Sequence, residues 1–352
     1  MKELLTLSLL FAMFTCNQAP SESSETSSRK INSESLADAL AYLAQHCGKN
    51  GLDETLVLHQ NDTLYAGDSI HRVHDIWSCT KSFTSTAVGL MSAEGLLDLD
   101  QPVADHEPLL RERYPTATYR HFLTMTSGYN AEGSTRWEGD TSEDWSLTPY
   151  VPGKPNNAPG EAFAYWDEAM IMLGRAMTQV LSKQERAVDL NTYLEERLFS
   201  KIGIPKRGWW GEGQVNGVDI NFGGTGLKLS AAEHARFGQL FLQDGVWEGE
   251  RLLPEGWVGQ ATLLQVPPTL PLADTDRASV GGPGHYGFNW WIIPADAEAG
   301  TPAATYTSGL NHNVCLVVPE WDLVVVRQGT DGNPAAGKGV VYKELLVRLA
   351  GR

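Results

Sequence analysis

The chain has 352 residues, of which 42% are hydrophobic and 20% are charged, and its formal net charge is −16. This composition excludes a disordered protein, and so acidic a surface argues against nucleic acid and anionic lipid headgroups as partners. The length allows one large domain or two closely packed ones.

The first residues are typical of an export signal. Lys2 precedes an apolar run over residues 4–14 that is too short to span a bilayer. The run ends close to Cys16, and a polar segment follows. A cysteine in this place is similar to the lipidated cysteine of bacterial lipoproteins, although Met13-Phe14-Thr15 departs from the usual preceding sequence. Simple cleavage and a plain apolar first helix therefore remain alternatives.

Three segments are expected on this basis: a signal peptide at 1–15, a polar tether at 16–32, and a domain at 33–352. The mature protein is expected to be exported, and either periplasmic or anchored to a bacterial membrane through lipidated Cys16. No transmembrane span is predicted in the mature chain.

The first half of the domain begins with a helix and a hairpin. Apolar residues at helical spacing predict a helix over residues 36–43, and alternation around Asn61-Asp62 predicts a β-hairpin over 56–65. Residues 77–97 are helical in pattern and apolar nearly all round, which is typical of a helix in the centre of a large core. Further helices are predicted at 169–181 and 190–198.

The second half becomes rich in strands. Ser230-Ala231-Ala232-Glu233 is a capping box that predicts the start of a helix reaching Leu242. Four strands and a closing helix follow, at 286–293, 305–309, 314–318, 323–327 and 340–349. Because strands lie at both ends of the chain with short connections, we expect an α/β (α+β) fold: an antiparallel sheet flanked by helices, with a helical, loop-rich insertion at about 98–226.

Several common signatures do not apply. The four cysteines form no Cys-x-x-Cys pair, so a zinc site is not expected, and Cys79 and Cys315 lie in apolar runs typical of buried thiols. Residues 282–287 have the letters of a dinucleotide-binding fingerprint but precede a predicted strand, so we interpret them as a loop. Neither a metal nor an organic cofactor is expected.

One Ser-x-x-Lys pattern carries chemistry. The pattern alone is weak, and Ser27-Ser28-Arg29-Lys30 also matches it. Ser78-Cys79-Thr80-Lys81, however, opens the most apolar predicted helix. Residues three apart share a helix face, so Lys81 is expected to be buried beside the Ser78 hydroxyl, and burial lowers the pKa of an ammonium. The alternative is a serine N-cap followed by a surface lysine.

Several further segments extend this pattern. They occur in the order Glu94-Gly95-Leu96-Leu97-Asp98-Leu99-Asp100, Phe122-Leu123-Thr124-Met125-Thr126-Ser127-Gly128, Pro159-Gly160-Glu161-Ala162-Phe163-Ala164-Tyr165, Ala235-Arg236-Phe237-Gly238-Gln239-Leu240 and Tyr286-Gly287-Phe288-Asn289-Trp290-Trp291. With these motifs the chain, from Leu36 onward, resembles the β-lactamase-related serine hydrolases. These are relatives of class C β-lactamases, penicillin-binding esterases and 6-aminohexanoate-oligomer hydrolases. The resemblance implies a β-lactamase/transpeptidase-like fold and a catalytic Ser78 and Lys81.

The family's second motif, Tyr-x-Asn, reads Tyr165-Trp166-Asp167 here. The resemblance implies that Tyr165 is the general base and acid. Asp167 replaces the asparagine, and a carboxylate beside Lys81 would hold that lysine protonated. Alternatively, Asp167 is a helix N-cap, and both roles can coexist. Trp166 is assigned to the site by its position.

The third motif, Lys-Thr-Gly or His-x-Gly in the family, is best matched by Thr307-Ser308-Gly309. The resemblance implies that the backbone amides of Ser78 and Leu310 form the oxyanion hole. No cation occupies the first position, which argues against penicillins and cephalosporins as good substrates. His312 is a candidate substitute for the cation, and its alternative is a solvated loop histidine.

Together these features predict acyl transfer to water through an acyl-enzyme on Ser78. A small-molecule ester is the first substrate choice and an amide the second, and no oligomeric state can be assigned. Two alternatives stay open: a β-lactamase or D,D-peptidase, and a non-catalytic binding protein on the same scaffold.

Overall fold

The structure is a computed structural model that describes residues 31–132, 148–184, 189–209, 213–273 and 283–352. The predicted signal peptide, Cys16, nearly all of the tether and the second Ser-x-x-Lys match at Ser27 lie outside the described residues. No helix within the described ranges is both long and apolar enough to cross a bilayer.

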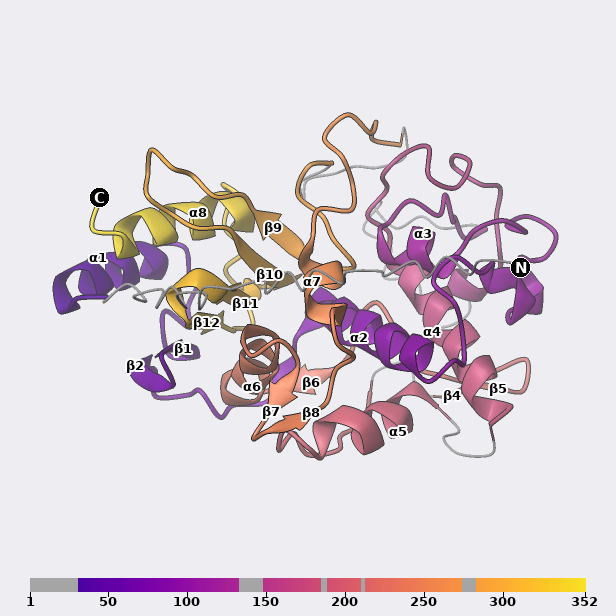
Figure 1. Ribbon diagram of the computed structural model, residues 1–352, viewed down its shortest axis with the longest axis horizontal. Coiled ribbons are helices and arrows are strands. Elements are labelled where there is room, and N and C mark those ends of the chain that lie inside the picture. Colours follow the sequence, from indigo (N-terminus) through magenta and orange to yellow (C-terminus); the bar gives the residue numbers. More distant parts are fainter. Residues whose placement is uncertain (1–30, 133–147, 185–188, 210–212, 274–282) are drawn as a thin grey trace, which may run out of the picture.

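A six-stranded antiparallel sheet forms one half of the molecule (Figure 1), as the sequence predicts. Its strands run in the order β2-β1-β12-β11-β10-β9. Their bounds are Thr55–His59 (β1), Asp62–Ala66 (β2), Trp291–Ile293 (β9), Ala304–Gly309 (β10), Asn313–Val318 (β11) and Leu323–Arg327 (β12). Strands β11 and β12 are buried along their whole length, because helices cover both faces of the sheet there.

The two faces are covered by helices from opposite parts of the chain. Helices α1 (Ser33–Ala44) and α8 (Lys338–Leu349) pack together on one face. Helix α6 (Ala231–Leu242) lies on the other, against β11 and β12. The predicted capping box at its start is confirmed, since Ser230 and Glu233 exchange both hydrogen bonds. Gly238 lets α6 approach closely, because a Cβ there would lie 2.6 Å from Cys315 Sγ.

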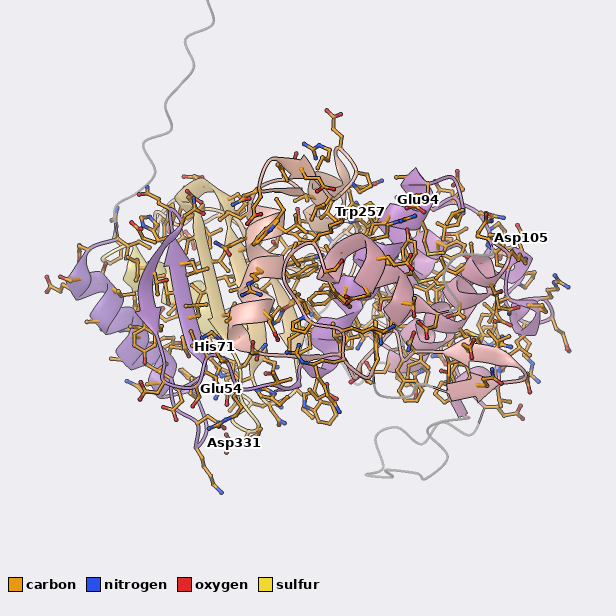
Figure 2. All side chains as sticks on the ribbon, turned by 90° about the horizontal axis from the view of Figure 1, so that it is seen from below. Glu54, His71, Glu94, Asp105, Trp257 and Asp331 are labelled. Atoms are coloured by element: carbon orange, nitrogen blue, oxygen red, sulfur yellow. The ribbon has the colours of Figure 1, made fainter. Side chains whose placement is uncertain are left out.

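The second half is helical and is built around α2 (Thr80–Ala93), which is buried from Thr80 to Met91. Figure 2 shows the division: the labelled Glu54 and Asp331 lie in the sheet half, and Glu94 and Asp105 in the helical half. The remaining helices are α3 (Tyr119–Leu123), α4 (Asp167–Ser182), α5 (Leu190–Leu194) and α7 (Trp257–Thr262). The described residues also form three two-stranded sheets. They pair β3 (His74–Asp75) with β6 (Lys228–Leu229), β4 (Gly213–Val215) with β5 (Val218–Ile220), and β7 (Val246–Trp247) with β8 (Glu250–Arg251).

Three predicted elements are wrong in extent. The helix predicted at 77–97 begins as a 3₁₀ turn at Trp77–Cys79, because Trp77 has a left-handed φ of 53°, and it ends at Ala93, just before the left-handed Gly95. The helix predicted at 190–198 stops at Leu194 and continues as one π turn over Glu195–Phe199.

The strand predicted at 286–293 is confined to Trp291–Ile293. The chain before it folds back on itself, since Gly287 N–H donates to the carbonyl of Trp290 at 2.9 Å and Asn289 has a left-handed φ of 58°. Phe288 and Trp290 are fully buried in the core although they lie outside any strand. Residues 283–287 are not helical, in agreement with the loop interpretation.

Candidate active site

Ser78 and Lys81 meet at the start of the central helix. Ser78 lies in the 3₁₀ turn that leads into α2, and Lys81 follows one turn later. The Lys81 side chain is only 2% exposed. Its ammonium donates to Ser78 Oγ at 2.7 Å and to the carbonyl oxygen of Gly224 at 2.7 Å. The structure therefore places the predicted pair in direct contact, with the lysine buried.

Asp167 is the third acceptor of the ammonium. Lys81 thus contacts a hydroxyl, a carboxylate and a backbone carbonyl, and it also interacts with the Tyr165 hydroxyl. Burial by itself lowers the pKa of Lys81, but the Asp167 carboxylate and Tyr165 outweigh it and raise the pKa above its usual value. The electrostatic role predicted for Asp167 is consistent with this geometry, and the resting site holds Lys81 as a cation.

Asp167 is not the N-cap of its helix, contrary to the alternative interpretation. It is the first residue of α4, and Trp166, whose backbone is extended, occupies the cap position. A carboxylate in the first helical turn still interacts favourably with the helix dipole. Trp166 is 6% exposed and belongs to the hydrophobic core. Because its backbone is extended, the residues on either side of it, Tyr165 and Asp167, project to the same side of the chain.

Tyr165 completes the group. The Lys81 ammonium lies 5.0 Å from the centre of its ring, and the Tyr165 hydroxyl interacts with both Ser78 and Lys81. Burial raises the pKa of Tyr165; the Lys81 charge opposes this and Asp167 adds to it, so that the pKa lies above its usual value. The phenol is therefore protonated at neutral pH. The ring is fixed by Trp291 and Tyr286, at centroid distances of 5.5 and 6.2 Å.

The third motif lies on strand β10, beside the nucleophile turn. Strand β9 pairs only with Ala304–Tyr306, so the second half of β10 packs against the turn at Trp77–Cys79. A Cβ on Gly309 would lie 2.1 Å from the Ile76 carbonyl oxygen, and only glycine allows this approach. The next residue, Leu310, has a side chain 47% exposed. Its backbone N–H donates to no backbone carbonyl of the described residues.

Alternation along β10 separates the motif's side chains. Thr307 faces α6, where its hydroxyl lies 3.1 Å from His234 Nε2 and accepts the N–H of Cys315 at 3.1 Å. Ser308, which is half-buried, lies on the other face together with Tyr306, and Tyr306 interacts with Tyr165. The position that holds a cation in the family is thus filled by a hydroxyl that is already engaged in the core.

The expectation for His312 is wrong in both of its forms. The residue is fully buried and its Nδ1 lies 3.1 Å from the carbonyl oxygen of His46, so it is not a solvated loop histidine. Burial lowers its pKa to about 3, with the charges of Arg327 and Lys338 adding to the effect. His312 is therefore neutral and does not supply the missing cation.

Two residues of the site escaped the sequence analysis. Gly224 contributes the carbonyl that accepts from Lys81, and a Cβ there would lie 3.0 Å from the carbonyl oxygen of Asp167. Asp75 accepts the N–H of Trp77 at 2.6 Å and so holds the left-handed residue before Ser78. The glycine-rich run at 223–226 could have indicated Gly224, since closely spaced glycines indicate close backbone approach. No sequence pattern indicated Asp75.

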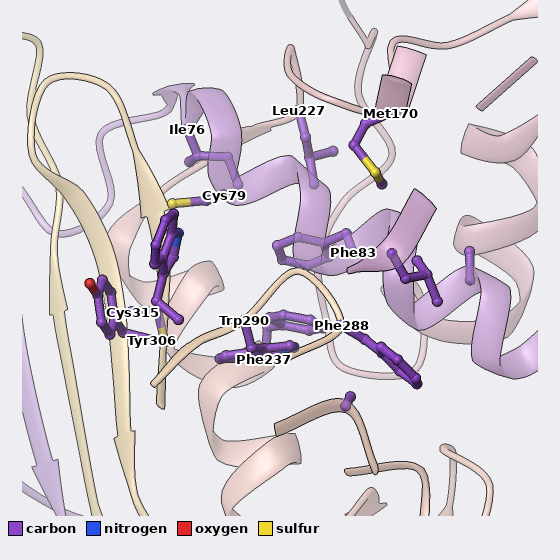
Figure 3. Close-up of a cluster of buried hydrophobic side chains, with 14 of the residues drawn as sticks. Ile76, Cys79, Phe83, Met170, Leu227, Phe237, Phe288, Trp290, Tyr306 and Cys315 are labelled. Atoms are coloured by element: carbon purple, nitrogen blue, oxygen red, sulfur yellow. The ribbon is translucent and has the colours of Figure 1, made fainter. Parts of the chain in front are cut away.

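A rigid aromatic core supports the nucleophile turn (Figure 3). Phe83, one turn beyond Thr80 on α2, stacks on Phe237 of α6 at a centroid distance of 3.8 Å, and Phe237 in turn stacks on Trp290 at 5.9 Å. Cys79 is fully buried, and its thiol donates to the carbonyl of Asn313 at 3.3 Å, which joins the turn to the sheet. Cys47, Cys79 and Cys315 are free buried thiols. Across the described ranges, no cluster of three or more histidine, cysteine and acidic side chains is arranged to hold a metal ion.

Comparisons with known proteins identify the family of the chain. Residues 68–327 match the family model described as Beta-lactamase. The 6-aminohexanoate-dimer hydrolase of Paenarthrobacter ureafaciens is 26% identical to this chain over 328 residues, which cover 86% of the chain and 79% of the relative.

Two solved structures show the same fold at low sequence identity. The class C beta-lactamase of Rhodobacter sphaeroides has a TM-score of 0.61 at 16% identity, covering 90% of this chain and 99% of that one. EstCE1, described as a hydrolase with promiscuous acyltransferase activity, has a TM-score of 0.64 at 17% identity, covering 90% and 98%. The predicted β-lactamase/transpeptidase-like fold is thereby confirmed. Because the family model spans most of a chain in which the Ser78–Lys81 pair and Tyr165 converge, this protein belongs to the Beta-lactamase family of serine hydrolases.

Proposed function

We propose that the protein is an exported hydrolase that cleaves a small ester or amide through an acyl-enzyme on Ser78, with esters preferred over amides. The observation that carries the proposal is the 2.7 Å contact between Lys81 Nζ and Ser78 Oγ, with Tyr165 beside both groups. A hydroxyl in contact with a buried lysine and a phenol is the arrangement of an activated nucleophile.

The reaction follows from this geometry. Ser78 Oγ bonds to the substrate carbonyl carbon while its proton passes to the Lys81–Tyr165 pair. The carbonyl electron pair moves onto oxygen, where the amides of Ser78 and Leu310 hold it. When the carbonyl re-forms, the bond to the leaving alcohol or amine breaks and the pair returns the proton. Water then repeats the sequence on the acyl-enzyme and releases the acid.

The pair must first lose one proton, because Lys81 is held as a cation and Tyr165 as a neutral phenol. The basic form of the pair is therefore scarce at neutral pH, and the pH dependence of kcat/KM should rise with its appearance. Since the two groups interact strongly, the rise belongs to the pair as a whole.

The preference for esters over β-lactams rests on the third motif. Thr307 is uncharged, so this position offers no cation to a β-lactam carboxylate. Its hydroxyl is also engaged by His234 and Cys315 on the α6 side of the sheet. The named activity of the 6-aminohexanoate-dimer hydrolase supports an amide as the second substrate class. A β-lactamase or D,D-peptidase is the alternative that the same chemistry would serve.

The export part of the proposal is supported by sequence alone. Lys2, the apolar run at 4–14 and the polar segment after Cys16 have the order of a signal peptide and tether. Membrane anchoring depends on lipidation of Cys16, and Cys16→Ser should release an anchored protein into the soluble fraction. A protein found in the cytoplasm with residues 1–15 intact would refute export.

Labelling with a fluorophosphonate probe tests the nucleophile. The wild-type protein should be labelled at Ser78, and Ser78→Ala should abolish both labelling and ester hydrolysis while leaving the thermal unfolding transition in place. Ser92→Ala, at the end of the same helix, is the matched control and should stay reactive. An unlabelled wild-type protein would favour the binding-protein alternative.

A substrate panel tests the preference. Short p-nitrophenyl esters should have a kcat/KM about 10- to 150-fold above that of nitrocefin, since a missing charge-assisted contact costs about 1.5–3 kcal/mol. Equal values for the two would favour the β-lactamase alternative, and faster turnover of the matching anilides would reverse the order of esters and amides.

A further inference from the structure

The turn between β10 and β11 has an unusual backbone. Asn311 and His312 are consecutive residues in the left-handed region, with φ of 58° and 61°. Neither is glycine, so the conformation costs free energy and persists only where the surroundings impose it. This turn begins with Leu310, the residue whose amide the family resemblance implies as part of the oxyanion hole.

Asn313 fixes the first peptide of the turn. Its side-chain amide donates to the carbonyl of Leu310 at 2.6 Å and to that of Gly329 at 3.2 Å, and its side-chain oxygen accepts the N–H of Gly329 at 3.2 Å. The residue is fully buried. A single amide side chain therefore joins the turn to the segment that follows β12.

Arg327 fixes the rest of the turn. Its Nη1 donates to the carbonyls of Asn311 at 2.8 Å, of His312 at 3.4 Å and of Asp331 at 3.4 Å. Arg327 is also fully buried, and no carboxylate within the described ranges forms an ion pair with it. Besides these carbonyls the guanidinium interacts with the Cys47 thiol, so it is buried among neutral groups, which is costly for a charged side chain.

These hydrogen bonds account for the turn's three carbonyl groups, and Asn333 Oδ1 accepts the N–H of His312 at 3.1 Å. The Leu310 N–H has no acceptor among the backbone carbonyls of the described residues, and the preceding residue, Gly309, lies against the Ile76 carbonyl. Two sets of contacts thus set the position of the Leu310 amide. Gly309 of β10 lies against Ile76 on one side, and Asn313 and Arg327 hold the turn on the other.

We propose that Asn313 and Arg327 are positioning residues, which hold the Leu310 amide at the distance from Ser78 at which it stabilises the tetrahedral oxyanion. The inference rests on the proposed function, because an oxyanion forms only if Ser78 is acylated. Neither residue touches substrate. Both act by fixing the peptide that does, so their loss should weaken transition-state binding more than ground-state binding.

Asn313→Ala and Arg327→Met test the proposal. In each, kcat/KM for p-nitrophenyl acetate, counted per site labelled by fluorophosphonate, should fall about 10- to 100-fold, which is up to the loss seen when an oxyanion donor is removed. Affinity for phenylboronic acid, which forms a tetrahedral adduct with the nucleophile, should fall by a similar factor. Affinity for a non-covalent competitive inhibitor should change less than about twofold.

Arg175→Met is the matched control. Arg175 is a buried arginine paired with Glu107 in the helical half, so its loss should cost stability without weakening phenylboronic acid binding. If Asn313→Ala or Arg327→Met fails to fold, Asn313→Ser and Arg327→Lys replace them, and a smaller loss of boronate affinity is expected.

Unchanged boronate affinity in the folded variants, with a reactive wild-type protein, would overturn this inference alone. A wild-type protein that neither reacts with fluorophosphonate nor binds the boronate would overturn the proposed function and this inference together. An equal loss of boronate affinity in Arg175→Met would show that general destabilisation, and not the turn, is responsible.

Discussion

At the residue scale, the protonation of Lys81 depends on two opposing effects. Burial favours the neutral amine, whereas Asp167 and Tyr165 favour the cation, and the latter effect is larger. The Ser-x-x-Lys spacing predicted the burial of the lysine and its contact with Ser78. Only Asp167, in place of the family's asparagine, indicated that the pKa of Lys81 is raised. The contact between Lys81 and Asp167 is consistent with that interpretation.

Replacing this carboxylate should move the pH profile. Asp167→Asn keeps the shape of the side chain and removes a charge that raises the pKa of both Lys81 and Tyr165. The pair should then lose its proton at lower pH, so the rising limb of kcat/KM against pH should shift to lower pH. Initial rates followed by pH-stat titration of the released acid would measure it.

Asp189→Asn is the control for this experiment. Asp189 is the N-cap of α5, where its carboxylate accepts the N–H of Thr192 at 2.7 Å, and asparagine keeps that cap. Its pH profile should match that of the wild type. A rising limb that stays in place in Asp167→Asn, together with a loss of stability of α4, would leave Asp167 with a helix-terminus role only.

At the scale of elements, β10 performs two tasks with different stretches of its length. Ala304–Tyr306 pair with β9, and the following residues pack against the nucleophile turn. The strand's place in the sheet therefore fixes the distance between the third motif and Ser78. Gly309 is the contact point, because its missing side chain lets the strand reach the Ile76 carbonyl.

Gly309→Ala should separate these two elements. The new Cβ would lie 2.1 Å from the Ile76 carbonyl oxygen and 3.1 Å from Cys79 Sγ, so the strand or the turn must move. We expect kcat/KM for p-nitrophenyl acetate to fall about 100-fold or more, since a displacement of about 1 Å at a reacting centre can cost that much. Steady-state kinetics on protein shown to be folded by circular dichroism would measure the loss.

Gly259→Ala gives the matched control. Gly259 lies in α7, its Cβ would meet nothing within 4 Å, and alanine favours a helix over glycine. That variant should keep full activity and gain up to about 1 kcal/mol of stability. Full activity in Gly309→Ala would mean that β10 does not set the geometry of the site.

Local sequence signals predicted the elements well, and tertiary packing set the exceptions. The capping box at Ser230 marked a helix start to the residue, because cap and helix are adjacent in sequence. The strand predicted at 286–293 failed because Gly287 and Asn289 turn the chain into the core, where aromatic burial mimics a strand pattern. Asn313 and Arg327 had no local signal, since their partners come from other loops.

At the scale of the whole molecule, two buried histidines link stability to pH. His234 lies under the sheet, with its ring nitrogens 3.1 Å from Thr307 Oγ1 and from Gln328 Nε2. Burial lowers its pKa to about 3, as it does that of His312. In the unfolded chain both would titrate near the ordinary histidine pKa of about 6.5. The unfolded state therefore binds more protons than the folded state between these values.

Acid should accordingly destabilise the fold in a defined window. The stability that these histidines contribute is complete above about pH 6.5 and is lost progressively as the pH falls toward about 3. At about pH 5 the free energy of unfolding should be lower by about 2 kcal/mol per histidine. Urea unfolding at neutral pH and at about pH 5 would measure the difference. His312→Gln should reduce the difference relative to wild type, whereas His71→Gln, at an exposed histidine, should leave it unchanged. An identical difference in all three proteins would contradict this account.

The pairing of β1 with β12 also bears on how the chain is made. Thr55 pairs with Arg327, so the sheet joins a strand near the start of the domain to one near its end. During synthesis, β1 and β2 have no sheet to join until β12 has left the ribosome, and such non-local pairing forms slowly. The sheet therefore stays incomplete during synthesis until the last strands have left the ribosome. Because β10 and β11 belong to this same sheet, the site at Ser78 can reach its final geometry only after the last strands have formed.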